Sequence, residues 1–213
     1  MMPGMAAGPN IFEFLKLPDT YEIHYLHWLQ PLSNNESLQQ YCKRLIEEQI
    51  YHENPILLGV SFGGIIIQEM AQQMDARQLI LISTIKNENE WSPFHKILRQ
   101  IHLYKLLPLQ LFNYLSFFDK IAFNKRAKHR IELYKRYMDV KNPEYLKWSI
   151  KKILNWKATP INLPFVHFVG EKDLVFPPRY IHNPKIIVPK GRHDMIIFKA
   201  NWFNKYLPDI LVK

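Results

Sequence analysis

The stretch L-L-G-V-S-F-G-G at residues 57–64 decides the fold, because it places one serine between glycines at the junction of two apolar runs. The run before it has the length of a buried strand, and the run after it is typical of a helix. Gly59 and Gly63 stand two residues before and two residues after Ser61. In a sharp strand-to-helix turn, side chains at these positions would collide. The pattern therefore predicts a turn that lifts the Ser61 hydroxyl above the sheet. A glycine-rich turn with an inert serine would have the same sequence pattern.

A serine hydroxyl needs a neighbouring base before it can act as a nucleophile at neutral pH. His193 is the candidate among nine histidines, because it lies in G-R-H-D-M between a short apolar run and the last predicted helix. A loop at that point can hold an imidazole over the carboxyl edge of a sheet. We expect His24, His27 and His167 in the core or on the surface. Two further histidines could line a pocket, and these are His102 and His129.

The base in turn needs a carboxylate that orients its second ring nitrogen. Asp173 ends the stretch F-V-G-E-K-D, twenty residues before His193. The rival acids are Glu171 and Asp194. Asp194 adjoins the histidine in sequence, where the required geometry is seldom reached, and Glu171 is expected to be solvated. Asp173 is therefore the predicted orienting acid.

Apolar and amphipathic segments alternate along the two ends of the chain. The predicted strands are Tyr21–Leu29, Pro55–Val60, Gln78–Ile85, Pro164–Gly170 and Lys185–Val188. The predicted helices are Ser37–Ile50, Ile65–Met74 and Met195–Tyr206, and Ser37 with Gln40 has the spacing of a capping box. Strands that alternate with helices over short loops favour a mostly parallel sheet covered on both faces. The fold class is therefore α/β.

The middle of the chain, residues 86–157, interrupts this alternation with amphipathic helical segments and no convincing strand. The segments are separated near Pro108, Phe118–Asn124 and Asn142–Pro143. We predict an all-helical cap at 86–157, inserted into a core formed by 1–85 and 158–213. The cap holds 16 Lys and Arg against 6 Asp and Glu, which indicates solvated helix faces or an anionic partner such as a membrane surface.

Composition excludes several classes of protein. The chain has 213 residues, 47% of them hydrophobic, which is enough for one core with an inserted subdomain. The single cysteine, Cys42, rules out an internal disulfide, and no Cys/His spacing of a zinc site is present. No signal peptide, membrane span or nucleic-acid-binding motif is apparent, so a cytoplasmic location is expected.

In chain order, the three candidates are Ser61, Asp173 and His193, each after its own predicted strand. With G-x-S-x-G at 59–63, G-x-x-D at 170–173 and G-x-H-x-M at 191–195, the chain resembles the small serine hydrolases of the α/β-hydrolase family over nearly its whole length. The resemblance implies catalysis through an acyl-enzyme, with no metal or organic cofactor. An aromatic-rich cap implies a small-molecule substrate with an apolar acyl or alcohol part.

The resemblance also implies an oxyanion hole built from two backbone amides. One amide belongs to Phe62, and the other to Met5 in the turn Pro3-Gly4-Met5, which could instead be a flexible terminal stretch. In this family the third strand of the sheet precedes that turn. In this chain only Met1 and Met2 precede it. We therefore expect strand three to be missing or reduced to a stub, with the true start about ten residues upstream or a truncated form.

Two other functions remain open from the sequence. A non-catalytic ligand-binding protein could keep this fold and use the capped cavity, and the short strand three favours that alternative. A membrane-surface protein could use the basic cap helices. Within the hydrolase interpretation, esters, thioesters, amides, lactones and the carbon–carbon bonds of diketones all require the same three residues, so the bond type stays open.

Overall fold

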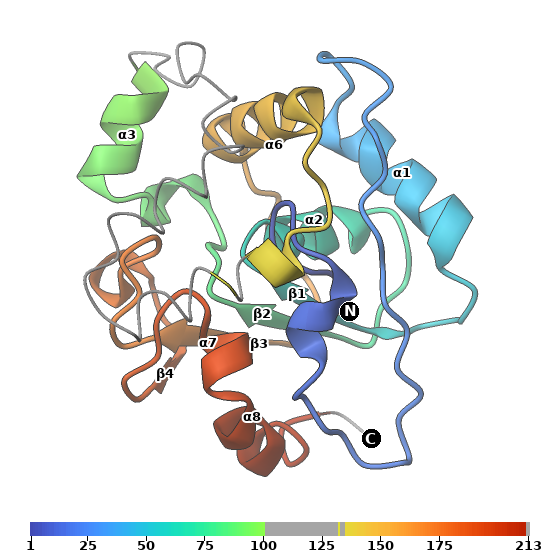
Figure 1. The fold of residues 1–213 in the computed structure, drawn as a ribbon, viewed down its shortest axis with the longest axis vertical. Helices are drawn as coiled ribbons and strands as arrows, with labels where there is room; N and C mark the ends of the chain where they lie inside the picture. Colours follow the sequence, from blue (N-terminus) through green and yellow to red (C-terminus); the bar gives the residue numbers. More distant parts are fainter. Residues whose placement is uncertain (101–131, 133–134, 212–213) are drawn as a thin grey trace.

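The computed structural model describes residues 1–100, 132 and 135–211 (Figure 1). Its described residues form a parallel sheet in the order β1-β2-β3-β4. The strands are β1 (Ile56–Val60), β2 (Gln78–Ile82), β3 (Phe165–Gly170) and β4 (Ile186–Val188). All four carboxyl ends therefore point to one edge of the sheet, where loops can gather side chains from distant parts of the chain.

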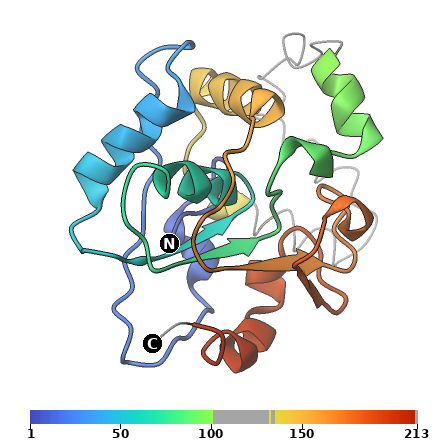
Figure 2. The same ribbon diagram turned by 180° about the vertical axis from the view of Figure 1, so that it is seen from behind.

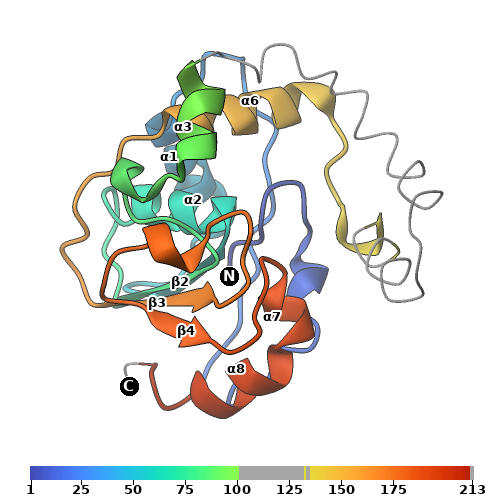
Figure 3. The same cartoon turned by 90° about the vertical axis from the view of Figure 1, so that its left-hand side faces the viewer.

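Helices cover both faces of this sheet. The described helices are α1 (Leu38–Gln49), α2 (Phe62–Met70), α3 (Pro93–Gln100), α6 (Pro143–Asn155), α7 (Met195–Phe198) and α8 (Ala200–Tyr206), with short 3-10 turns at Pro9–Phe12, Glu88–Glu90 and Pro178–Tyr180. Seen along the sheet, α1 and α2 lie on one side and α8 on the other (Figure 3). The architecture is the three-layered α/β fold that the alternation of segments predicts.

Each face of the sheet has its own apolar core. Leu57, Leu79 and Leu81 point toward the layer of α1 and α2. Their neighbours along the strands, Leu58 and Ile80 among them, point toward α7 and α8. Because both faces are covered, the strands are apolar at nearly every position rather than at alternate ones.

Most predicted elements are confirmed, with shifted ends. The capping box is present, since Gln40 N donates to Ser37 Oγ at 3.1 Å and Ser37 N donates to Gln40 Oε1 at 3.0 Å. Helix α2 begins at Phe62, earlier than predicted, because the turn passes directly from Ser61 into the helix. The predicted closing helix is broken at Lys199, which separates α7 from α8.

The predicted strand Tyr21–Leu29 is wrong, because this segment is extended but is not part of the sheet. Its neighbour is a two-residue stub, too short to build a ladder. Met1 N donates to His24 O, and Leu26 N donates to Met1 O at 2.9 Å. A single extended segment therefore runs beside the N-terminus (Figures 1 and 2).

The expected stub of strand three lies between that segment and β1. Met2 pairs in parallel with Gly59: Met2 N donates to Leu58 O at 2.7 Å, and Val60 N donates to Met2 O at 3.1 Å. Met2 is completely buried. The stub thus supplies β1 with a short neighbour and leads directly into the turn at Pro3-Gly4-Met5.

The predicted cap is described only at its two ends, by α3 and α6. Residues 101–131 and 133–134, which hold the predicted breaks near Pro108 and Phe118–Asn124, lie outside the described residues, so the boundary 86–157 stays a prediction. At the second end, the Trp148 ring lies 4.5 Å from Tyr41 and 6.2 Å from Phe62, centroid to centroid. Helix α6 is thereby packed against α1 and α2. In the described parts of the chain, no helix combines the length and apolarity needed to cross a membrane.

Candidate active site

The strand-to-helix turn at Ser61 has the predicted geometry. Ser61 is the N-cap of α2 and has φ 54° and ψ −118°, a conformation that L-residues rarely adopt. A Cβ on Gly59 would lie 2.4 Å from Gly63 O, and a Cβ on Gly63 would lie 2.3 Å from Pro3 O. Both glycines are therefore required by close backbone contacts, one inside the turn and one between the turn and the N-terminal loop.

The structure brings together the three side chains that the sequence singles out. His193 Nε2 lies 2.9 Å from Ser61 Oγ, and His193 Nδ1 lies 3.0 Å from Asp173 Oδ2. With an ionised Asp173, Nδ1–H donates to the carboxylate, which leaves Nε2 free to accept the Ser61 proton. The three groups form one continuous hydrogen-bond chain at the carboxyl edge of the sheet.

Asp173 is held rigidly below the histidine. Its side chain is buried, and its Oδ1 accepts hydrogen bonds from the backbone amides of Val175 and Phe176 at 2.8 and 2.9 Å. The rival acid Glu171 is exposed and accepts from Lys190 N at 2.6 Å. Asp194 occupies the N-cap position of α7. The hydrogen-bond contacts of His193 Nδ1 go to the two oxygens of the Asp173 carboxylate, at 3.2 and 3.0 Å.

Two glycines bring the Asp173 and His193 loops into contact. A Cβ on Gly170 would lie 2.7 Å from Gly191 O. Lys172 N donates to the same Gly191 oxygen at 2.7 Å. Since Gly170 ends β3 and Gly191 follows β4, this close approach sets the distance between the carboxylate and the imidazole. It accounts physically for the glycines in the G-x-x-D and G-x-H-x-M motifs.

The turn at Pro3-Gly4-Met5 lies against the serine. A Cβ on Gly4 would lie 3.6 Å from Ser61 Cβ. The Trp28 indole N–H is shared between Gly4 O and Ala7 O, at 3.0 and 3.1 Å, and its ring stacks on Phe62 at 5.2 Å. Trp28 therefore fixes the loop that carries the Met5 amide, a role that no local motif indicates.

The Phe62 amide is the second predicted oxyanion donor. Phe62 is the first residue of α2, where a backbone N–H has no acceptor within the helix. The Met5 residue and Ser61 both line the cavity beside the triad. Phe62 directly follows Ser61, and Met5 follows Gly4, at which a Cβ would lie 3.6 Å from Ser61 Cβ.

An apolar cavity of about 440 Å³ opens above Ser61. The residues that line it come from the core and from both ends of the predicted cap. The apolar ones include Trp91, Ile150, Leu154 and Phe176. His95 also lines it, and its Nδ1 lies 2.7 Å from Ser92 Oγ. Burial lowers the pKa of His95, and the nearby Asp173 charge opposes that effect. No local motif in the sequence marks His95, which is the third residue of α3.

His24, His27 and His167 are not among the residues that line the cavity at Ser61. His24 and His27 are exposed, and His167 is buried, as expected of surface and core residues. His167 Nε2 lies 3.0 Å from Thr84 O, and its Nδ1 lies 3.1 Å from Lys86 Nζ. Burial, assisted by the Lys86 charge, lowers the pKa of His167 to about 3. The remaining candidates, His102 and His129, lie outside the described residues.

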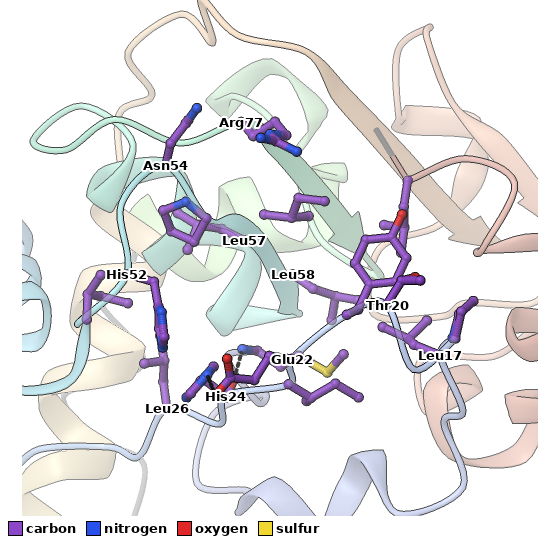
Figure 4. Close-up of a pocket in the computed structure, with 18 of the residues that line it drawn as sticks. Leu17, Thr20, Glu22, His24, Leu26, His52, Asn54, Leu57, Leu58 and Arg77 are labelled. Carbon is purple, nitrogen blue, oxygen red and sulfur yellow. Dashed lines mark hydrogen bonds and ion pairs between the residues drawn. The ribbon is translucent and has the colours of Figure 1, made fainter. Parts of the chain in front are cut away.

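A larger cavity, of about 910 Å³, lies at the amino end of β1 (Figure 4). It is lined by the N-terminal stub, the segment around Glu22 and the beginning of β1, and by none of the triad residues. The positive-φ Ser61 and the hydrogen-bond chain lie at the smaller cavity, which is therefore the candidate active site although it is not the larger of the two. Three possible metal ligands, Glu22, His24 and His52, meet at this larger cavity.

Known proteins resemble this chain in fold, but no family model or curated protein sequence matches it. A hydrolase from Pseudomonas aeruginosa PA01 aligns over 100% of this chain and 89% of its own, with a TM-score of 0.70 and 15% identity. An esterase from Exiguobacterium antarcticum aligns over 98% and 90%, with a TM-score of 0.67 and 15% identity.

A thermophilic esterase from Thermogutta terrifontis aligns over 99% of this chain and 89% of its own, with a TM-score of 0.61 and 13% identity. At such identities the likeness concerns the path of the backbone. That path includes the parallel sheet, the turn into α2 and the loops that follow β3 and β4. The protein has the α/β-hydrolase fold.

Proposed function

We propose that the protein is a serine hydrolase of carboxylesterase type, with Ser61 as nucleophile, His193 as general base and Asp173 as orienting acid. The observation that carries the proposal is the unbroken chain of hydrogen bonds from Ser61 Oγ through His193 to the buried Asp173 carboxylate. The fold neighbours named as esterases and hydrolases support the same class of reaction.

The first step forms an acyl-enzyme. Ser61 Oγ attacks the carbonyl carbon of an ester while His193 Nε2 accepts the hydroxyl proton. Negative charge develops on the carbonyl oxygen, and the amides of Phe62 and Met5 donate hydrogen bonds to it. When the tetrahedral intermediate collapses, the imidazolium gives its proton to the departing alkoxide, and the acyl group stays on Ser61.

The second step repeats this sequence with water. His193 takes a proton from a water molecule, the resulting hydroxide attacks the acyl carbon, and the proton returns to Ser61 Oγ as the acid leaves. Throughout, Asp173 stays ionised and stabilises the imidazolium. The lining of the 440 Å³ cavity favours an ester with an apolar acyl or alcohol part, because its walls are predominantly apolar.

Labelling with a fluorophosphonate probe tests the proposal directly, since the probe reacts with activated serines. We expect labelling of the wild type and none of Ser61→Ala. Ser33→Ala removes an exposed serine that does not line the cavity, and this variant should label like the wild type. A panel of p-nitrophenyl esters of increasing acyl length then measures kcat/KM. Absence of labelling in a folded wild-type protein would contradict catalysis and favour a ligand-binding role for the same cavity.

A further inference from the structure

At the rim of the larger cavity, two histidines and one glutamate converge from separate segments of the chain. The nearest ligand atoms of Glu22, His24 and His52 all lie within 4.8 Å of one another. His24 Nε2 is 2.9 Å from Glu22 Oε1, and the His24 and His52 rings lie 4.3 Å apart, centroid to centroid. We propose that Glu22, His24 and His52 form a binding site for a divalent transition-metal ion of the zinc type.

The backbone presents these side chains from a fixed frame. Glu22 and His24 are two residues apart on an extended segment, so their side chains project to the same side. The His24 carbonyl accepts a hydrogen bond from the Met1 amino group. The positions of Glu22 and His24 are therefore tied to the N-terminal stub, which is itself paired with β1.

His52 comes from the loop that follows α1, and that loop is tied to the same extended segment. Gln49, the last residue of α1, accepts a hydrogen bond from His27 N at 2.7 Å through Oε1. Its Nε2 donates to His27 O at 3.0 Å. This two-way contact holds the segment carrying His24 and the loop carrying His52 side by side. Figure 4 shows Glu22, His24 and His52 among the residues around the cavity.

The donor set matches the preference of zinc. Two imidazole nitrogens and one carboxylate oxygen form a three-ligand site that leaves a fourth position to water. Imidazole favours zinc and its neighbours in the first transition row over magnesium or calcium, which prefer oxygen ligands alone. Glu22 and His24 come from one segment of the chain and His52 from another. The three residues therefore have no short ligand spacing that could be recognised in the sequence.

Little rearrangement is needed to close the site. Zinc bonds of about 2.0–2.1 Å to nitrogen and oxygen bring tetrahedral ligand atoms to roughly 3.4 Å from one another. The Glu22 and His24 side chains are 74% and 46% exposed, so rotation can shorten the longer separations without disturbing packed atoms. Because the residues are exposed, the ion also loses only part of its hydration on binding.

The effect of such an ion is on stability and not on the proposed chemistry. It would clamp the extended segment to the loop after α1, at the amino ends of the strands. The triad lies at the carboxyl ends, and none of the three proposed ligands lines the cavity above Ser61. The inference is therefore independent of the function proposed for Ser61.

Zinc binding to the untagged full-length protein tests the site. Protein freed of metal with a chelator is titrated with Zn²⁺ in competition with a chromophoric chelator, and with Co²⁺ while visible absorption is recorded. We expect the wild type to bind one ion at this site. The affinity for that ion should be at least tenfold lower in His24→Ala, His52→Ala and Glu22→Gln. The same ion should give the Co²⁺ protein the absorption bands of a tetrahedral site.

His27→Ala is the matched control, because His27 is an exposed histidine of the same segment outside the cluster. It should bind the ion like the wild type. At tenfold excess over the wild-type Kd, Zn²⁺ should raise the Tm of the wild type and of His27→Ala by roughly 3–5 °C, and that of His52→Ala by no more than about 1–2 °C. Equal binding by His52→Ala and the wild type, or no binding at millimolar Zn²⁺, would overturn the inference.

Discussion

Gly63 is the residue through which the serine turn and the N-terminal loop touch. A Cβ at this position would lie 2.3 Å from Pro3 O and 2.5 Å from Met2 O, both backbone atoms that cannot rotate away. The contact couples the orientation of the elbow to the position of the stub beside β1. A methyl group here would have to push the stub out of the sheet.

We expect Gly63→Ala to lower the free energy of unfolding by about 1–3 kcal/mol, the usual cost of overpacking. Fluorophosphonate labelling should fall with it, because the loop carrying the Met5 amide is displaced. Urea unfolding measures the first effect. Gly4→Ala is the comparison, since its Cβ would meet described atoms no closer than 3.6 Å; equal destabilisation by both substitutions would count against the close contact at Gly63.

Asp173 supplies both a charge and an acceptor to the site. Asp173→Asn keeps the size of the side chain and can still accept from the Val175 and Phe176 amides through its oxygen. Its NH₂ group then faces His193 Nδ1, which favours the wrong imidazole tautomer. We expect kcat for a p-nitrophenyl ester to fall by about 10³–10⁴-fold with little change in KM.

Glu171→Gln is the control for this prediction, because Glu171 is the exposed carboxylate nearest in sequence. It should retain most of the activity. If Glu171→Gln and Asp173→Asn lost activity equally, the assignment of Asp173 as orienting acid would be wrong.

Among the elements, α1 shows most plainly how local sequence determines a boundary. Ser37 and Gln40 exchange two hydrogen bonds that satisfy amides at the start of the helix. Ser37→Ala should lower the free energy of unfolding by about 1 kcal/mol, measured by urea unfolding. Ser37→Asp restores a side-chain acceptor and should recover most of that loss. A loss of similar size in Ser37→Asp would mean that the cap is not the cause.

The elements that the sequence predicts well are those determined by their own residues. The β1 and β3 runs are apolar on both faces, and the glycines around Ser61, Asp173 and His193 mark backbone contacts that a Cβ would break. Tyr21–Leu29 has the composition of a strand, yet it lacks a partner longer than two residues. Strand formation there depends on a neighbour elsewhere in the chain, which local periodicity does not contain.

The residues of the candidate site also fall into those that the sequence predicts and those that it does not. Ser61, Asp173 and His193 could be predicted because each follows its own apolar run and its own glycine. The residues that shape the space around them could not, since they act through long-range contacts. Trp28 holds the loop at Gly4 and Ala7 with its indole N–H, and Ile150 and Leu154 reach the cavity from α6.

At the scale of the whole molecule, the buried His167 makes stability depend on pH. Its pKa is about 3 in the folded protein, below the ordinary value of about 6.5 expected in the unfolded chain. As the pH falls through 6.5, the unfolded chain takes up a proton that the folded protein refuses. The stabilisation present above pH 6.5 is therefore lost progressively between pH 6.5 and 3.

Between pH 7.5 and 5.0, this single group should remove about 2 kcal/mol from the free energy of unfolding. His167→Gln can keep contacts to Thr84 O and Lys86 but does not titrate. Its stability should therefore fall less steeply than that of the wild type over this range, by about that amount. Urea unfolding at several pH values measures the slopes. His27→Gln, at an exposed position, should keep the wild-type slope; an unchanged slope in His167→Gln would show that another group is responsible.

The hydrogen bond between Ser61 and His193 joins residues 132 positions apart. Ser61 follows β1, whereas Asp173 and His193 follow β3 and β4, so the bond needs these strands in place and we expect it to form late in folding. The backbone hydrogen bonds of α1 and α2 join residues about four positions apart, so we expect these helices to form earlier. During refolding from denaturant, the helical circular dichroism signal should therefore recover before fluorophosphonate reactivity. The rate at which reactivity returns would then report how fast the sheet is completed.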